Sequence, residues 1–234
     1  MNYYFLLEDE KSFLKVLPKW LEYLGFKCTR VPDITYVREN NYVLQSGRGV
    51  TQLVTKVIFD TIDTILDNPN TIDKLIVFLD TEEEDEEYRK NDVFTRVNEH
   101  YNNAQFDFEL VVCVCNHCFE SWLLGRERLY PEIPVALEAD FYPYYLHYDI
   151  ENNDPEEMCV PEDKNETTAQ YHFHYLCELF RYRKMRYSKN KPNLVMDKSY
   201  FDGMKNRAEK TGHIDSFNRF IQFIYNENSL MELK

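Results

Sequence analysis

Apolar residues in the first half of this chain form short continuous runs, and between these runs lie longer stretches in which apolar residues have helical spacing. Three runs are apolar at nearly every position and predict buried strands: residues 3–7, 74–79 and 108–115. Helical spacing predicts helices over residues 10–24, 50–67 and 91–102, and residues 26–31 alternate like a further strand. Strands that lack strict alternation and are separated by helices are typical of a mostly parallel sheet with helices on both faces. The predicted fold class is therefore α/β.

The second half of the chain has a different pattern. Prolines, tyrosines and acidic residues interrupt any period over residues 126–165, which predicts an irregular insertion. Helices are predicted over residues 119–125, 166–186, 198–210 and 214–226. We therefore expect an α/β domain over 1–125, the insertion, and a helical, basic C-terminal part over 166–234.

Composition is that of a folded protein without a membrane segment. Of the 234 residues, 44% are hydrophobic and 15% aromatic, which excludes a disordered tail or linker. The apolar runs are far shorter than the roughly 20 residues that cross a bilayer, and the N-terminus lacks the features of a signal peptide. Six cysteines without regular spacing are typical of reduced thiols. We expect a soluble, cytoplasmic protein with no membrane partner.

Charge is unevenly distributed along the chain. The net charge is −14, yet residues 171–224 carry eleven Lys and Arg against five acidic residues, so this stretch is +6 and the remainder −20. Residues 181–191 mix six cations with two aromatics, which suits a phosphate backbone with exposed bases. The candidate nucleic-acid contacts are Arg183, Arg186 and Lys189 on one side of a predicted helix, and Lys191 after them. A solvated helix face, or pairing with the acidic remainder of the chain, explains the same pattern.

Acidic residues follow two of the predicted strands. Glu8 comes directly after the first strand, and Asp80 and Glu82 follow the strand over 74–79. Ligands of open α/β sheets bind beyond the carboxyl ends of the strands, where these carboxylates can converge on Mg²⁺. The loop before the helix at residue 50 also carries Arg48 between two glycines, a candidate phosphate contact. The alternative is that these acidic residues and this loop have no ligand and are simply exposed to solvent at the strand ends.

The order of these features resembles the TOPRIM family of topoisomerases, primases and OLD-type nucleases. That family binds Mg²⁺ for phosphoryl transfer with a glutamate after its first strand and a DxD motif after a later strand. The resemblance implies a TOPRIM-like catalytic domain in which Glu8, Asp80 and Glu82 are the metal ligands. The chain departs from the pattern at Glu82, where the family has aspartate, so Glu84 or Asp85 is an alternative ligand.

Two further segments resemble small bacterial TOPRIM-like proteins linked to phage defence, among them RloB-like proteins and the TOPRIM effector of PARIS-type systems. Residues 116–124 match an FExWLL segment, and residues 186–189 match a YxK motif. This resemblance implies that Glu120 adds a metal-binding or general-base carboxylate, and that Lys189 neutralises phosphate in the transition state. An equal alternative is that Glu120 is a helix cap or a buried partner for a basic residue. The alternative for Lys189 is that it is an ordinary exposed lysine.

The function that the resemblance implies is hydrolysis of phosphodiester bonds in DNA or tRNA, with Mg²⁺ or Mn²⁺, by an anti-phage defence effector. Proteins of the kind that this chain resembles often act with or under an ATPase partner, and this chain has no Walker A pattern of its own. A homodimer is a further candidate arrangement. The alternative function is a catalytically silent TOPRIM-like subunit that binds the ATPase partner, which the acidic balance and the departure at Glu82 favour.

Overall fold

The computed structural model describes residues 1–131, 135–137 and 139–233, which form two compact units. Unit 1 comprises Met1–Asp80, Glu84–Val114 and Phe223–Lys234, and unit 2 comprises Thr81–Glu83 and Cys115–Gln222. Because the units interleave along the sequence, the domain boundaries expected at residues 125 and 165 stay predictions. Part of the predicted insertion, residues 132–134 and 138, lies outside the described residues.

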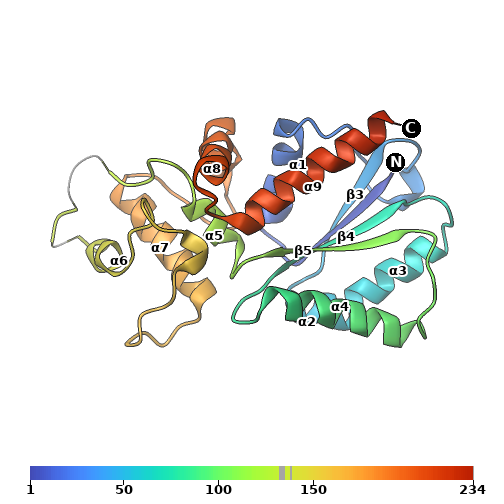
Figure 1. Ribbon diagram of the computed structural model, residues 1–234, viewed down its shortest axis with the longest axis horizontal. Coiled ribbons are helices and arrows are strands. Elements are labelled where there is room, and N and C mark those ends of the chain that lie inside the picture. The colour runs from blue at the N-terminus through green and yellow to red at the C-terminus, as the bar shows by residue number, and fades with distance from the viewer. Residues whose placement is uncertain (132–134, 138, 234) are drawn as a thin grey trace. The chain divides into compact units, whose positions relative to one another are not determined.

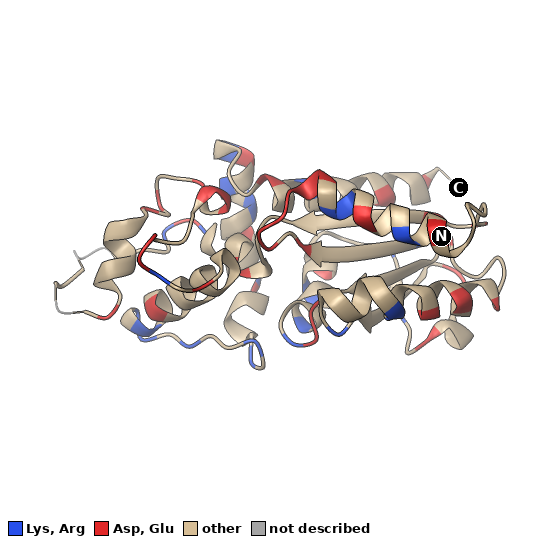
Figure 2. Cartoon of the chain, turned by 90° about the horizontal axis from the view of Figure 1, so that it is seen from below, with Lys and Arg blue, Asp and Glu red and all other residues tan. Residues whose placement is uncertain are grey.

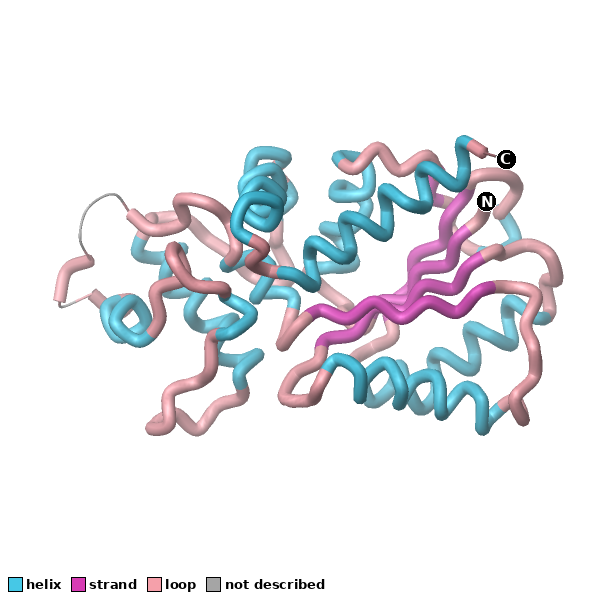
Figure 3. The backbone as a smooth tube through the Cα atoms, viewed as in Figure 1, coloured by secondary structure: helices cyan, strands magenta, loops and turns pink. Residues whose placement is uncertain are grey.

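Unit 1 is built on a five-stranded, all-parallel sheet, which confirms the predicted α/β class. The strands are β1 (Tyr3–Leu7), β2 (Thr29–Arg30), β3 (Asn41–Ser46), β4 (Lys74–Asp80) and β5 (Glu109–Cys115), in the order β2-β3-β1-β4-β5. Tyr3 of β1 stands in register with Tyr42 of β3 and Lys74 of β4. The first strand of the chain is therefore the centre of the sheet (Figure 3).

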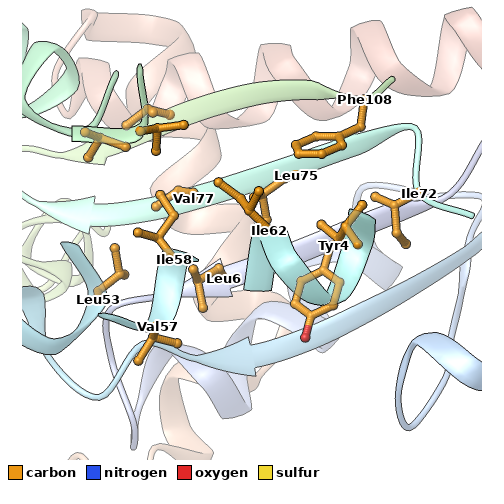
Figure 4. Close-up of a cluster of buried hydrophobic side chains, with 14 of the residues drawn as sticks. Tyr4, Leu6, Leu53, Val57, Ile58, Ile62, Ile72, Leu75, Val77 and Phe108 are labelled. Carbon is orange, nitrogen blue, oxygen red and sulfur yellow. The ribbon is translucent and has the colours of Figure 1, made fainter. Parts of the chain in front are cut away.

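Helices cover both faces of this sheet (Figure 1). One face carries α1 (Phe13–Tyr23) and the end of α9 (Asp215–Glu232); the other carries α2 (Val50–Gln52), a π-helical turn (Leu53–Val57), α3 (Ile58–Leu66) and α4 (Glu86–His100). On the first face Tyr3 and Phe5 pack against Phe26. On the second, Tyr4 and Leu6 point into the aliphatic core shown in Figure 4. Because both sides of β1 are buried, its sequence shows no polar alternation.

Two elements of unit 1 differ from their predicted bounds. The strand predicted over residues 26–31 is reduced to the two residues of β2, and Phe26 lies before this strand with its ring packed against those of Tyr3 and Phe5. The helix predicted from residue 91 begins at Glu86, because the Asp85 carboxylate accepts hydrogen bonds from two backbone N–H groups of its first turn (2.8 and 3.2 Å). Acidic side chains are favourable in the first turn of a helix, and the last two residues of the acidic run, Glu86 and Glu87, form that turn.

Unit 2 is mostly helical and has its own core. Its helices are α5 (Phe119–Leu124), α6 (Tyr142–His147), α7 (Thr168–Tyr182), α8 (Lys198–Thr211) and the first part of α9. Unit 2 also has 3-10 turns at Pro155–Glu157 and Asn193–Met196, and unit 1 has one at Ile34–Tyr36. Trp122 of α5 is fully buried, and its ring centroid lies 5.3 Å from that of Phe217 and 5.8 Å from that of Phe220 in α9. From the predicted insertion, the ring of Phe141 lies 5.4 Å from that of Tyr175 in α7. The insertion therefore contributes to the core of unit 2.

Asp9 caps α1 from outside the helix. Its Oδ2 accepts hydrogen bonds from the backbone N–H groups of Ser12 (2.8 Å) and Phe13 (2.6 Å), and from the Ser12 hydroxyl. Asp9→Ala removes the acceptor of these donors and should lower the free energy of unfolding, measured in urea, by about 1–2 kcal/mol. Glu10→Ala, at an exposed neighbouring position, is the control. An equal loss in both variants would contradict the capping role.

Candidate functional site

The carboxyl ends of β1, β3 and β4 meet at one edge of the sheet in unit 1. Leu7, the last residue of β1, is in register with Ser46 of β3 and Phe78 of β4. The chain leaves β1 toward α1 on one face of the sheet and leaves β3 toward α2 and α3 on the opposite face (Figure 1). Open α/β sheets bind their ligands at points where neighbouring strands connect to opposite faces. Glu8 is the first residue beyond β1 at this point.

Glu8 is fixed by hydrogen bonds on both sides. Its backbone N–H donates to the Phe78 carbonyl (3.0 Å), and its carbonyl accepts from the N–H of Gly49 (2.9 Å). Its carboxylate Oε2 accepts from the backbone N–H of Asp80 (2.9 Å), which directs the side chain toward the end of β4. Glu8 and Asp80 are both half-buried. Unit 1 therefore brings these two carboxylates to adjacent strand ends.

The loop over residues 46–49 connects β3 to α2 and is tightly packed at its first glycine. A Cβ on Gly47 would come within 2.6–2.8 Å of the Leu53 side chain, so a larger residue would force that side chain to move. Gly49 has a φ of +86°, in the region that favours glycine. Arg48, between them, also has a positive φ (62°), and its side chain is exposed. The π-helical turn that follows is a feature frequent at functional sites.

The other acidic residues predicted as metal ligands have separate surroundings. Glu82 belongs to unit 2, where its N–H donates to the His117 carbonyl (2.9 Å) and His117 Nδ1 lies 3.1 Å from the Glu82 carbonyl oxygen. Asp85 caps α4, so its carboxylate is engaged by the helix. Glu84 is exposed in the turn before it.

Two carboxylates are sufficient for a metal ion of the predicted kind. Mg²⁺ is usually bound through one or two protein carboxylates and keeps several waters, and Glu8 and Asp80 lie next to each other at adjacent strand ends. Mn²⁺ accepts the same oxygen ligands. Within the described ranges, no group of three or more His, Cys, Asp or Glu side chains is arranged to hold a metal ion. Water or substrate oxygens would therefore complete the coordination shell.

Glu120 and Lys189 come together in unit 2. Glu120 is fully buried in α5; its Oε1 accepts from the Tyr187 hydroxyl (2.8 Å), and its Oε2 lies 3.4 Å from Lys189 Nζ. Lys189 Nζ also lies 5.4 Å from the centre of the Phe173 ring in α7. The sequence predicts a role for the two charged residues but assigns none to Tyr187, although Tyr187 is the tyrosine of the YxK motif. A buried carboxylate thus holds two side chains of the segment after α7.

The helix that was predicted to include the basic segment ends at Tyr182. Lys184 takes a left-handed φ of 56°, and the backbone N–H of the next residue bonds back to the Phe180 carbonyl (2.8 Å), which closes the helix without a glycine. The prediction that Arg183, Arg186 and Lys189 line one side of a helix is therefore wrong.

Figure 2 shows Lys and Arg residues in blue, and those that follow α7 have different surroundings. Arg183 donates hydrogen bonds to the carbonyls of Arg128 (3.0 Å) and Leu129 (2.7 Å), so its guanidinium anchors another segment of unit 2. Arg186 and Lys191 line a pocket of about 660 Å³. Unit 2 therefore brings two of the predicted nucleic-acid contacts into one cavity and uses a third as an anchor.

One serine–histidine pair has the spacing of a catalytic dyad but is sealed inside unit 2. Ser121 Oγ lies 2.8 Å from His172 Nδ1, and His172 Nε2 lies 2.7 Å from the Met158 carbonyl oxygen. Both side chains are fully buried, and burial lowers the pKa of His172 to about 3. The imidazole is therefore neutral at physiological pH, and it links α5 to α7 rather than activating a nucleophile.

Comparison of the chain with known protein families, curated proteins and solved structures found no match. Among the helices in the described part of the chain, none is both long enough and apolar enough to cross a bilayer. The candidate site consequently rests on the geometry of the chain itself. The candidate metal-binding residues are Glu8 and Asp80 in unit 1, and the basic segment after α7 is a separate feature of unit 2.

Proposed function

We propose that this chain is a Mg²⁺-dependent nuclease that hydrolyses phosphodiester bonds in DNA or tRNA. The observation that carries the proposal is the Glu8 carboxylate, held by the Asp80 N–H where β1 and β3 connect to opposite faces of the sheet. Two acidic side chains at such a point suit a hard divalent cation. The resemblance to TOPRIM proteins supports the same residues, and it suggests an anti-phage effector that acts with an ATPase partner.

In the proposed mechanism Glu8 and Asp80 hold the metal ion. When bound, the ion stabilises the charge that builds on the phosphate and lowers the pKa of a water molecule. The hydrogen bond from the Asp80 N–H orients the Glu8 carboxylate in advance, so little reorganisation is needed during the reaction. Arg48, exposed between two glycines, contacts a substrate phosphate. Glu82, which belongs to unit 2, stays a predicted ligand that this pair does not require.

Unit 2 supplies positive charge in the proposed mechanism. Lys189, held by the buried Glu120, presents its ammonium group to a substrate phosphate. Arg186 and Lys191 bind the nucleic-acid backbone, a contact that weakens as the salt concentration rises. Arg183 acts indirectly, by anchoring the backbone at Arg128.

A catalytically silent interaction subunit is the second candidate function. Outside residues 171–224 the chain carries a net charge of −20, which repels nucleic acid and suits a basic partner protein. Glu8 and Asp80 would then be solvated strand ends. The ATPase partner, or a second copy of the chain, would be what this subunit binds.

Cleavage assays separate the two candidates. Purified protein is incubated with plasmid DNA and with total tRNA, in Mg²⁺, in Mn²⁺ and in EDTA. The nuclease proposal expects cleavage that requires the metal, and the substrate that is cut identifies DNA or RNA. If neither substrate is cut, even after addition of the co-purified partner, the interaction subunit is the better account.

A further inference from the structure

A pocket of about 660 Å³ opens in unit 2 at the end of α7. Its lining comes from α7 and the segment that follows, and includes Cys177, Met185 and Tyr187 besides several cations. Pockets for small organic ligands measure about 300–1,000 Å³, so this one has room for a molecule the size of a nucleotide. The proposed metal site at Glu8 and Asp80 does not include it.

Three cations that line this pocket have no carboxylate partner among the described residues. We refer to Lys184, Arg186 and Lys191 as the basic triad. All three side chains are exposed, and none forms an ion pair with a carboxylate of the described residues. Arg181 at the same pocket differs, because it is paired with Glu178. Three cations that line one cavity without a counter-ion attract an anionic ligand.

The basic wall of the pocket has a defined conformation. The Tyr187 hydroxyl donates to the buried Glu120, and the Tyr187 ring centroid lies 6.1 Å from that of Phe180 and 6.3 Å from that of Phe173. The backbone N–H of Lys191 donates to the Ser188 carbonyl (2.9 Å). A wall that is ordered before the ligand arrives lowers the entropic cost of binding.

The remainder of the lining is uncharged. Met185 and Tyr187 are half-buried. Burial raises the pKa of the Cys177 thiol to about 11, and the nearby Glu120 adds to this, so the thiol is neutral at physiological pH. A ligand that fills the pocket therefore combines an anionic group with a flat or apolar one. Nucleoside phosphates have both, since a base can stack on an aromatic ring and contact sulfur.

We propose that this pocket binds a nucleoside phosphate, with the phosphate on the basic triad and the base against Met185 and Tyr187. A free nucleotide and one nucleotide unit of a single-stranded nucleic acid offer the same chemistry. The second source rests on the proposed nuclease function and would define its substrate as single-stranded; the first does not. A paired base inside a duplex cannot enter a cavity without being extruded, so duplexes should bind more weakly.

Isothermal titration calorimetry in EDTA tests this proposal without metal and without cleavage. The ligands are AMP, inorganic phosphate, a single-stranded oligonucleotide and the duplex of the same sequence. AMP should bind about tenfold more tightly than inorganic phosphate, because the base adds a stacking contact. Arg186→Gln combined with Lys191→Gln should weaken AMP binding by about tenfold or more. If the single strand binds more tightly than both AMP and the duplex, the ligand is the strand. If AMP and the strand bind equally tightly, the ligand is the free nucleotide.

Lys198→Gln is the matched control, since this exposed lysine lies in α8 of the same unit and is paired with Asp202. It should bind AMP as the wild type does, and circular dichroism should show that all variants are folded. The proposal is overturned if neither AMP nor the single strand binds, or if the double variant binds them as tightly as Lys198→Gln does. Cleavage is measured separately. If the protein cuts nucleic acid but binds neither AMP nor the single strand, the pocket proposal is overturned and the nuclease proposal stands. If the protein binds these ligands but never cuts nucleic acid, the pocket proposal stands and the nuclease proposal is overturned.

Discussion

Glu8→Gln should reduce the rate of metal-dependent cleavage by roughly a thousandfold. Glutamine keeps an oxygen that can accept the Asp80 N–H, so the hydrogen bond that orients the native side chain (2.9 Å) is retained. The substitution removes the negative charge that binds the cation. Several kcal/mol of transition-state stabilisation depend on the bound ion, and about 4 kcal/mol corresponds to three powers of ten in rate. Initial rates on the substrate that the wild-type protein cuts give the ratio.

Glu10→Gln is the control for this loss of charge. Glu10 is exposed and lies two residues beyond Glu8, so its replacement changes the net charge equally without touching the strand end. Its cleavage rate should stay within about twofold of the wild-type rate. Undiminished cleavage by Glu8→Gln would mean that the activity arises at another site, and an equal loss in both variants would mean that charge rather than metal binding is responsible.

Glu156→Gln should stabilise the protein at neutral pH by on the order of 3 kcal/mol and should have little effect at about pH 4. The Glu156 side chain is buried in unit 2, and burial raises its pKa from 4.5 to about 7, although hydrogen bonds from the Ser216 hydroxyl and N–H oppose the shift. The folded state therefore holds this proton more tightly than the unfolded chain does. Its contribution to stability is fully present below about pH 4.5 and is lost as the pH rises to about 7.

Urea unfolding of both proteins over this pH range measures the difference in the free energy of unfolding. Burial lowers the pKa of His172, so that residue costs stability as the pH falls, but it does so in both proteins and cancels from the difference. Glu157→Gln, at an exposed position of the same 3-10 turn, is the control for the loss of a carboxylate. A difference between Glu156→Gln and wild type that is constant with pH would contradict a neutral, buried Glu156.

The strands could be predicted from the sequence because both faces of the sheet are covered. In β4 every residue from Lys74 to Leu79 is buried, so the run has no polar face to interrupt it. The first residue of β2 could not be predicted. Phe26 packs against Tyr3, so the alternating pattern begins at Phe26, before the strand itself does. The hydrophobic pattern predicts too late a start for α4, because the capping residue Asp85 lies within an acidic run that is typical of a loop.

The candidate site was predictable only where it depends on strand ends. The carboxyl ends of parallel strands share an edge, so Glu8 and Asp80 could be grouped without tertiary information. The partners of Glu120 could not be predicted, since Tyr187 and Lys189 are distant in sequence and reach α5 only through the folding of unit 2. The sequence extends the predicted helix past Arg183 because the left-handed turn that ends α7 contains no glycine or proline.

Binding of Mn²⁺ to the purified protein, followed by the electron paramagnetic resonance signal of the free ion, tests most directly whether Glu8 and Asp80 form a divalent-cation site. The wild-type protein and Glu10→Gln should bind Mn²⁺ with the same affinity. Glu8→Gln and Asp80→Asn should each weaken that binding by at least about tenfold while remaining folded. If Glu8→Gln and Asp80→Asn both bind Mn²⁺ as tightly as the wild-type protein does, Glu8 and Asp80 do not form the proposed cation site.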